Sequence, residues 1–126
     1  MSDIPTPTPR ELEILKVLWR QGSGSVRDVY RQLLADDPGL AYNTVQTMLR
    51  VMEGKGLVRH EASGRTFIYT ARFTRDESTR RFLERVFDGA ASQLVSSLLR
   101  SERVSPEELK RMQALIAEAR RKQSGR

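Results

Sequence analysis

The sequence predicts a mainly α fold with one small β-hairpin. Helix-start signals recur along the chain, apolar residues repeat at helical spacing, and a glycine turn separates two β-rich segments. The 126 residues are enough for one domain, or for a small domain with an appendage. We expect one domain at residues 1–72 and a helical dimerisation domain at residues 73–126.

Two helices are expected in the first forty residues. Thr8, Pro9 and Glu11 form a capping-box pattern that begins the first helix, and the Gly-Ser-Gly segment 22–24 ends it. Ser25 and Asp28 repeat the pattern for a second helix, which a turn at residues 36–39 follows. The apolar face expected for the first helix consists of Leu12, Ile14, Leu15, Val17, Leu18 and Trp19.

A third helix, from Tyr42 to about Gly54 or Gly56, has two different faces. The apolar face consists of Val45, Met48, Leu49 and Met52. The opposite face carries Asn43, Gln46, Thr47 and Arg50. Asn and Gln bond adenine, Arg bonds guanine or phosphate, and Thr offers a hydroxyl and a methyl group. This face suits a DNA groove, while the alternative is an ordinary solvated helix face.

A β-hairpin is expected after the third helix. Residues 57–61 and 66–70 are rich in β-formers and flank a glycine-containing turn at 62–65. Three helices followed by a hairpin is the element order of a winged helix-turn-helix domain. Its third helix enters the major groove, and its hairpin, the wing, contacts backbone or minor groove. Arg65 is expected at the tip of the wing, although basic wing tips also occur on wings that contact nothing.

The remaining residues predict amphipathic helices that need a partner. Thr74 with Glu77 and Ser105 with Glu108 are helix starts, and Gly89 interrupts the helical pattern. These helices are too poor in apolar surface for an independent core, so a second copy of the chain is the simplest partner. The residues expected at the dimer contact are Phe82, Leu83, Val86, Phe87, Leu94, Leu98, Leu109, Met112, Leu115 and Ile116.

The composition narrows the class of function. The net charge of +6 favours a polyanionic partner, either nucleic acid or an anionic membrane surface. With one histidine and no cysteine, no metal site, cofactor or catalytic set is expected, and His60 is interpreted as a surface residue. No apolar run predicts membrane insertion and no secretory signal is visible, so we expect a cytoplasmic protein.

Several segments together resemble the penicillinase repressor (BlaI/MecI/CopY) family of bacterial transcriptional repressors. The resemblance covers nearly the whole chain. It is carried by residues 12–19, the run Gly-Leu-Ala-Tyr-Asn-Thr-Val-Gln-Thr at 39–47, Lys-Gly-Leu-Val at 55–58, Gly-Arg-Thr-Phe at 64–67 with Tyr69, Val-Phe-Asp-Gly at 86–89, and Ser-Pro-Glu-Glu-Leu at 105–109.

The resemblance implies a homodimeric repressor whose winged helix binds a palindromic operator in double-stranded DNA. In antibiotic-responsive members, the signal of a membrane-bound sensor protease leads to cleavage at an Asn-Phe bond. The aligned pair here is Ser97 and Leu98, which departs from the Asn-Phe pattern and retains only an apolar residue after the bond. A signal-dependent protease is a further partner that the resemblance implies. Copper-responsive members carry a cysteine pair that this chain lacks. Ala41-Tyr42-Asn43 stands where some members have Ser-Pro-Lys, so the operator sequence does not carry over.

The candidate DNA contacts divide by expected role. Gln46 is expected to read a base, Arg50 to hold phosphate, and both threonines to bond either. Two alternatives stay open: a winged-helix module that binds protein through the same face, and an architectural protein that binds DNA of any sequence. The full set of candidate contacts is Tyr42, Asn43, Thr44, Gln46, Thr47, Arg50 and Arg65.

Overall fold

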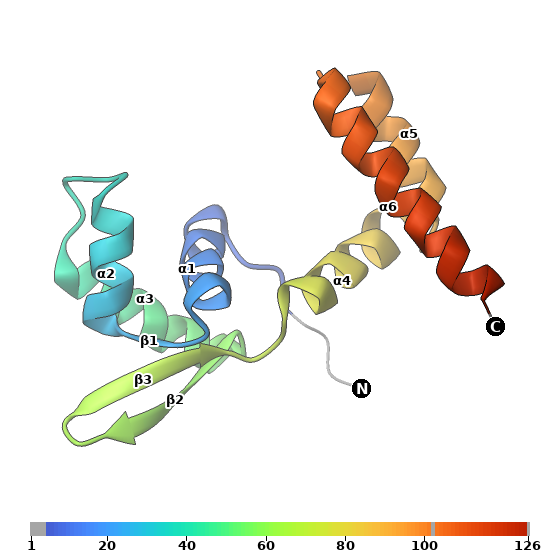
Figure 1. The fold of residues 1–126 in the computed structure, drawn as a ribbon. Coiled ribbons are helices and arrows are strands. Elements are labelled where there is room, and N and C mark those ends of the chain that lie inside the picture. The colour runs from blue at the N-terminus through green and yellow to red at the C-terminus, as the bar shows by residue number, and fades with distance from the viewer. Residues whose placement is uncertain (1–4, 102, 126) are drawn as a thin grey trace. The chain divides into compact units, whose positions relative to one another are not determined.

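The computed structural model describes residues 5–101 and 103–125. The chain divides into two compact units, Met1–Arg81 and Phe82–Arg126, which we call the N-terminal and C-terminal units. This division falls inside α4, later than residue 72, and the limits of the functional domains stay a prediction. Figure 1 shows the elements in chain order: α1 (Pro9–Gln21), β1 (Gly24–Ser25), α2 (Val26–Leu34), α3 (Tyr42–Lys55), β2 (Val58–Ser63), β3 (Thr66–Ala71), α4 (Arg75–Phe87), α5 (Ala91–Ser101) and α6 (Pro106–Ser124).

The helix starts follow the capping residues, which confirms those predictions. Thr8 Oγ1 accepts a hydrogen bond from the Glu11 backbone N–H, and the Glu11 carboxylate accepts one from the Thr8 N–H. The same reciprocal pair begins α2 and α4, and Ser105 caps α6 with a single bond. Each cap supplies partners for N–H groups that the first helical turn leaves unpaired.

The hydrophobic core of the N-terminal unit lies between α1, α2, α3 and the sheet. The apolar face of α3 is buried at Val45, Leu49 and Met52 as expected, with Met48 partly buried at its edge. Leu12 was expected in the core, but its side chain is exposed because it lies beside Lys16 at the margin of the buried stripe of α1. The fully buried side chains are Ile14, Leu15, Leu18, Val29, Val45, Leu49, Met52, Leu57 and Val58.

The hairpin is part of a three-stranded antiparallel sheet with the order β1-β3-β2. Strand β1 corrects the prediction that residues 22–24 only end a helix, because Gly24 pairs with Tyr69 and Ser25 with Ile68. The turn is also shorter than predicted. Ser63 pairs with Thr66, which leaves only Gly64 and Arg65 in the turn. Gly64 has φ +64°, as two-residue hairpin turns require, and Arg65 lies at the wing tip as expected.

An ion pair joins the first turn of α1 to the last turn of α3. Lys55 Nζ lies 2.7 Å from Glu11 Oε2, and the Glu11 side chain is 6% exposed. Burial alone would raise the pKa of Glu11. The hydrogen bonds from Lys55 and from the Thr8 N–H outweigh burial, so the pKa lies below its ordinary value. The carboxylate therefore stays charged and joins the start of α1 to the end of α3.

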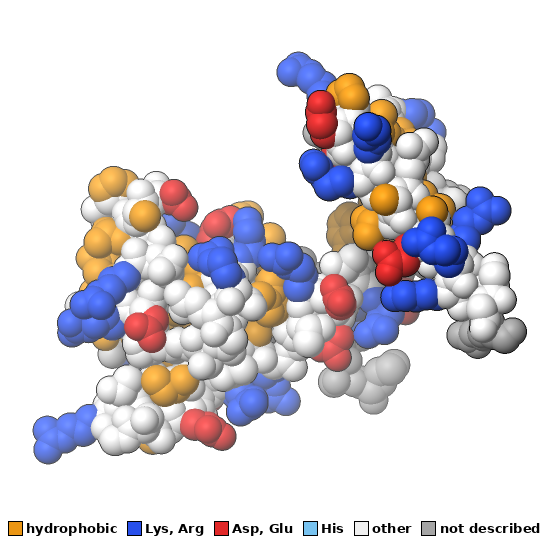
Figure 2. Space-filling view, viewed as in Figure 1, with side chains coloured by type: hydrophobic (Ala, Val, Ile, Leu, Met, Phe, Trp, Pro, Cys, Tyr) orange, Lys and Arg blue, Asp and Glu red, His pale blue; other side chains and the backbone are white. Residues whose placement is uncertain are grey.

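The C-terminal unit buries fewer of its apolar side chains than the N-terminal unit does. Among its described residues, no side chain of α5 or α6 is fully buried. The rings of Phe82 and Phe87 pack edge to face, with centroids 6.1 Å apart. Figure 2 shows hydrophobic side chains at the surface of this unit. Within residues 5–101 and 103–125, no helix combines the length and apolarity needed to cross a membrane. The large exposed apolar side chains of this unit are Phe82, Val86, Val95, Leu98, Leu99, Leu109, Leu115 and Ile116.

Candidate nucleic-acid interface

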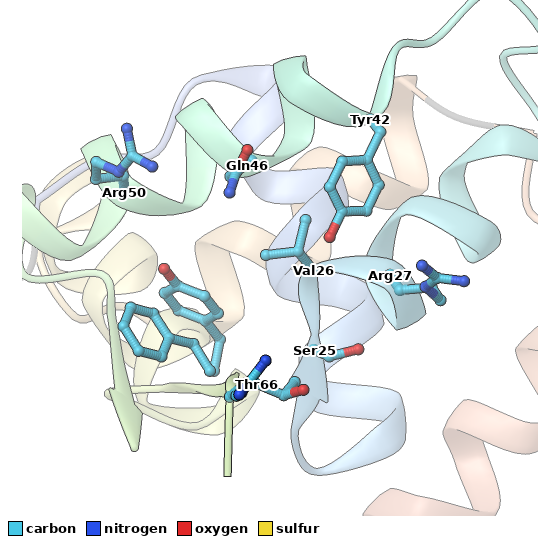
Figure 3. A pocket seen from close by; sticks show the side chains of 10 residues that line it. Ser25, Val26, Arg27, Tyr42, Gln46, Arg50 and Thr66 are labelled. Atoms are coloured by element: carbon cyan, nitrogen blue, oxygen red, sulfur yellow. The ribbon is translucent and has the colours of Figure 1, made fainter. Parts of the chain in front are cut away.

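A hollow opens on the N-terminal unit between α3, the start of α2 and the wing, which comprises β2, β3 and their turn. Tyr42, Gln46 and Arg50 follow one another along α3 at four-residue spacing and border this hollow (Figure 3). This spacing places their side chains on one face of the helix, beside the buried face. The other lining residues are Ser25, Val26 and Arg27 at the start of α2, and Arg65, Thr66, Phe67 and Tyr69 on the wing.

The hollow is lined by cations and by no carboxylate. Arg27, Arg50 and Arg65 border it from α2, α3 and the wing, respectively. In the part of the chain that the structure describes, none of the three guanidinium groups forms a salt bridge. Arg10 and Arg59, in contrast, lie 2.9 and 3.8 Å from Asp37 and Glu61. The hollow therefore offers uncompensated positive charge to an anion such as phosphate.

Tyr69 forms the floor of the hollow and keeps its phenol neutral. Its side chain is buried. Burial raises the pKa of Tyr69, the negative charge of Glu53 raises it further, and the Arg50 guanidinium opposes both effects. Because the phenol stays protonated at neutral pH, it adds no negative charge beside the arginines.

The start of α3 combines an aromatic contact with an open cap. Tyr42 packs edge to face against Tyr30 of α2, with ring centroids 5.6 Å apart. The N-cap residue, Ala41, makes no side-chain hydrogen bond, because alanine has no polar side-chain atom. The first turn of α3 therefore has no side-chain acceptor at its cap, and the Thr44 N–H donates instead to the Ala41 carbonyl at 3.1 Å.

The structure brings together only part of the predicted contact set. Tyr42, Gln46, Arg50 and Arg65 border the hollow. The side chains of Asn43, Thr44 and Thr47 are exposed on α3 but lie outside it. Each residue of a helix rotates the side-chain direction by about 100°, so these three point outward from the protein instead of toward the wing. Contact with DNA stays a prediction for the whole set.

Sequence reasoning missed the contributions of α2 and of the wing's inner face. Arg27 carried a usable signal, because a cation in the first turn of a helix opposes the helix dipole and calls for another role. Phe67 gave no such signal, since aromatic residues are common in strands. His60, interpreted above as a surface residue, is instead half-buried, with Nδ1 2.7 Å from Glu53 Oε1 and its ring stacked on Phe67.

Comparison with known proteins decides the family. The penicillinase repressor family matches residues 7–118. The chain is also 31% identical over 124 residues to the penicillinase repressor of Bacillus licheniformis, with 94% of each chain covered. The chain belongs to the penicillinase repressor family. Its relatives are transcriptional repressors, a class without enzymatic activity.

Solved structures similar to this penicillinase-repressor-family chain confirm the winged-helix fold. The DNA-binding domain of the repressor BlaI in solution is 32% identical, with a TM-score of 0.53 over 61% of this chain and 93% of that one. The structure of monomeric Bacillus licheniformis BlaI in complex with the blaP half-operator is also 32% identical, with a TM-score of 0.50 over 61% of this chain and 93% of that one. A MarR family protein from Bacillus stearothermophilus shares the fold alone, at 20% identity and a TM-score of 0.52, with 95% of this chain and 77% of that one covered.

Proposed function

We propose that the protein is a homodimeric transcriptional repressor that binds a palindromic operator through α3 and the wing. The observation that carries this proposal is the hollow bordered by α3 and by three arginines that form no salt bridge with any described residue. A duplex presents a line of phosphates and, in the major groove, base edges that Gln and Asn recognise. A relative of 32% identity was solved with a half-operator, which supports the same partner here. Repression then takes place where the chromosome lies, in the cytoplasm.

Within this proposal the polar residues of α3 divide into two roles. Gln46 lies between Tyr42 and Arg50 on the same helix face, and its amide matches the edge of adenine. Arg50, one turn farther along, and Arg65, at the wing tip, hold phosphates on either side of the hollow. Asn43, Thr44 and Thr47 face outward and contact bases or phosphates deeper in the groove. Arg27 extends the phosphate contacts to α2.

The exposed apolar faces of the C-terminal unit support the homodimer. Leu115 is 68% exposed and Ile116 55% exposed, on a helix whose other face is charged. Of the residues expected at the dimer contact, Leu83, Phe87, Leu94 and Met112 are half-buried and the other six are exposed. Helices with so many exposed apolar side chains need a partner surface, and a second copy supplies a self-complementary one.

Relief of repression by cleavage at Ser97 and Leu98 completes the proposal and rests on family resemblance alone. Both residues lie inside α5, and the Ser97 carbonyl accepts a 2.6 Å hydrogen bond from Ser101 Oγ. A protease reaches this bond only after α5 opens locally. A signal-dependent protease is thus the third partner, after DNA and the second protomer. Appearance of a fragment ending at Ser97 in cells exposed to the inducer supports this step; an intact chain after induction contradicts it.

Gel-shift measurements on promoter DNA test the role of α3. Replacing Gln46 with Ala should weaken binding to the preferred site by about 1–3 kcal/mol and leave scrambled DNA unaffected. Replacing Arg50 with Gln should weaken binding to every sequence and lower the salt slope by about one. Equal loss on scrambled DNA from the Gln46 change excludes base reading. Equal wild-type affinity for operator and scrambled DNA indicates an architectural protein, and no binding at low salt indicates a protein-binding module.

Sedimentation tests the dimer separately from DNA binding. The full chain should sediment as a dimer, and a chain ending at Arg81, the limit of the N-terminal unit, should sediment as a monomer. The shorter chain keeps Phe73, which is buried and whose carbonyl accepts a hydrogen bond from Trp19 Nε1. A dimeric short chain places the contact in the N-terminal unit and contradicts the assignment.

A further inference from the structure

We propose that Glu53 and His60 form a positioning pair that sets the angle between α3 and the wing, and thereby places Arg65 relative to Gln46 and Arg50. The inference rests on the proposed DNA-binding function. It adds a role for two residues that do not themselves border the hollow.

The pair lies where the wing leaves the core. His60 pairs with Tyr69 across the hairpin, and Tyr69 is the last buried residue of β3 toward the tip. Strand β1 pairs only at this rung and at the next one toward the tip, because its partners on β3 are Tyr69 and Ile68. Beyond this rung the wing has no fully buried side chain in the described residues. The core therefore fixes the base of the wing and leaves the direction of its outer part to local contacts.

His60 is the contact that joins this point to α3. Its Nδ1 lies 2.7 and 2.8 Å from the two oxygens of Glu53. A carboxylate only accepts, so the imidazole N–H donates. Among the hydrogen bonds recorded in the described residues, this is the one that joins side chains of α3 and the wing. The imidazole also stacks on Phe67, with ring centroids 4.1 Å apart and an interplanar angle of 22°.

Small changes at this rung become large displacements at the tip. Arg65 lies beyond three further rungs of the hairpin, at 61/68, 62/67 and 63/66. With a rise of about 3.4 Å per residue, the tip is roughly 10 Å from the rung, so a tilt of about 10° moves Arg65 by roughly 2 Å. Hydrogen-bond distances vary by only about 0.5 Å, so such a displacement removes a phosphate contact. Phe67 borders the hollow and also stacks on His60, so both follow the same tilt.

A double-mutant cycle in gel shifts distinguishes positioning from simple stabilisation of the fold. In the wild type, Arg65→Ala should weaken DNA binding about tenfold. With Glu53→Ala already present, Arg65→Ala should weaken it less than twofold, because the wing tip no longer lies at its phosphate. Arg27→Ala is the matched control and should cause the same fold-loss in both backgrounds, since Arg27 comes from α2. Glu53→Gln should restore the coupling, because an amide oxygen still accepts the His60 N–H bond.

A distance measurement without DNA keeps the two proposals separable. The chain has no cysteine, so a thiol-reactive spin label attaches only where a cysteine is introduced. Ser63→Cys places one label on the wing, and Val51→Cys places the other on the exposed face of α3. The distance distribution should broaden with Glu53→Ala or His60→Ala and stay narrow with Glu53→Gln. Broadening in a protein that binds no DNA overturns the proposed function and leaves the positioning pair standing. An unchanged distribution, or equal losses from Arg65→Ala in both backgrounds, overturns the positioning pair.

Discussion

The two units of the chain use the same helix-start chemistry and reach different degrees of burial. Thr8 caps α1 and Ser105 caps α6, each by accepting a hydrogen bond from the backbone N–H of a glutamate three residues along the chain. The face of α1 is then buried at Ile14 and Leu15, whereas the described residues of α6 include no fully buried side chain. Capping therefore decides where a helix begins, and the opposing surface decides whether its apolar face is covered.

This difference indicates where each unit finds its stability. The N-terminal unit covers its own apolar faces with three helices and a sheet. The C-terminal unit leaves comparable faces exposed, as at Leu115 and Ile116. Under the proposed function, the N-terminal unit folds and binds DNA without a partner, while the stability of the C-terminal unit depends on protomer concentration.

The largest expected effect compares a leucine from each unit. Leu49 is 0% exposed, so Leu49→Ala should lower the free energy of unfolding by about 2–5 kcal/mol at any protein concentration. Leu115 is 68% exposed, so Leu115→Ala should leave the unfolding of a dilute monomer almost unchanged and weaken the dimer about tenfold. Urea unfolding at two protein concentrations, together with sedimentation, measures both. A concentration-independent loss from the Leu115 change contradicts the comparison.

The next effect compares a tertiary ion pair with a local one. Glu11→Gln keeps an acceptor for the Thr8 N–H but removes the charge that faces Lys55, so it should destabilise the fold by about 1–2 kcal/mol near neutral pH. The pKa of Glu11 is lowered from 4.5, so this contribution is complete above that pH and disappears as pH falls through the folded-state value. The difference between wild type and variant should therefore shrink in acid, as measured by urea unfolding across pH.

Glu108→Gln in the C-terminal unit is the matched control for Glu11→Gln. Glu108 pairs with Arg111 three residues along the exposed surface of α6. Such a pair contributes less than about 0.5 kcal/mol. A loss from Glu108→Gln equal to that from Glu11→Gln contradicts the view that the buried, long-range pair of Glu11 stabilises the fold more than the exposed, local pair of Glu108.

The sequence predicted what is encoded locally and missed what depends on distant partners. The caps at Thr8, Ser25 and Ser105 each act over three residues, and the apolar repeat of α3 identifies its buried face, so both were predictable. Strand β1 has only two residues and exists because Gly24 meets Tyr69 far along the chain. No local pattern encodes such a pairing.

The candidate site divides in the same way. Tyr42, Gln46 and Arg50 follow from the periodicity of one helix, and Arg65 from the glycine turn beside it. The contact of His60 with Glu53 arises only when the wing folds back beside α3. The alternation of charged residues in the strand predicted exposure for His60, and tertiary packing overrode that pattern.

A smaller effect compares arginines of the two units. Arg27 borders the hollow, so Arg27→Gln should weaken binding to operator and scrambled DNA alike by about 1 kcal/mol and lower the salt slope by about one. Arg120 lies exposed near the end of α6, where a cation complements the helix dipole. Arg120→Gln also removes one positive charge. It should leave DNA affinity unchanged apart from the small effect of the lower net charge. Equal losses from both changes indicate that net charge, and not the hollow, controls DNA binding.

The last comparison tests whether the two units are energetically independent. Gly54 lies in the last turn of α3, where an added methyl group would meet no atom within 4 Å, so Gly54→Ala should stabilise the N-terminal unit by about 0.5 kcal/mol. Gly56 has φ +86°, so Gly56→Ala should destabilise it by about 1–2 kcal/mol although the space is equally open. Both glycines belong to the N-terminal unit. The urea midpoints of the two variants should therefore move in opposite directions, while the dimer dissociation constant stays fixed. A shift in that constant shows that the stability of the N-terminal unit is coupled to dimer assembly.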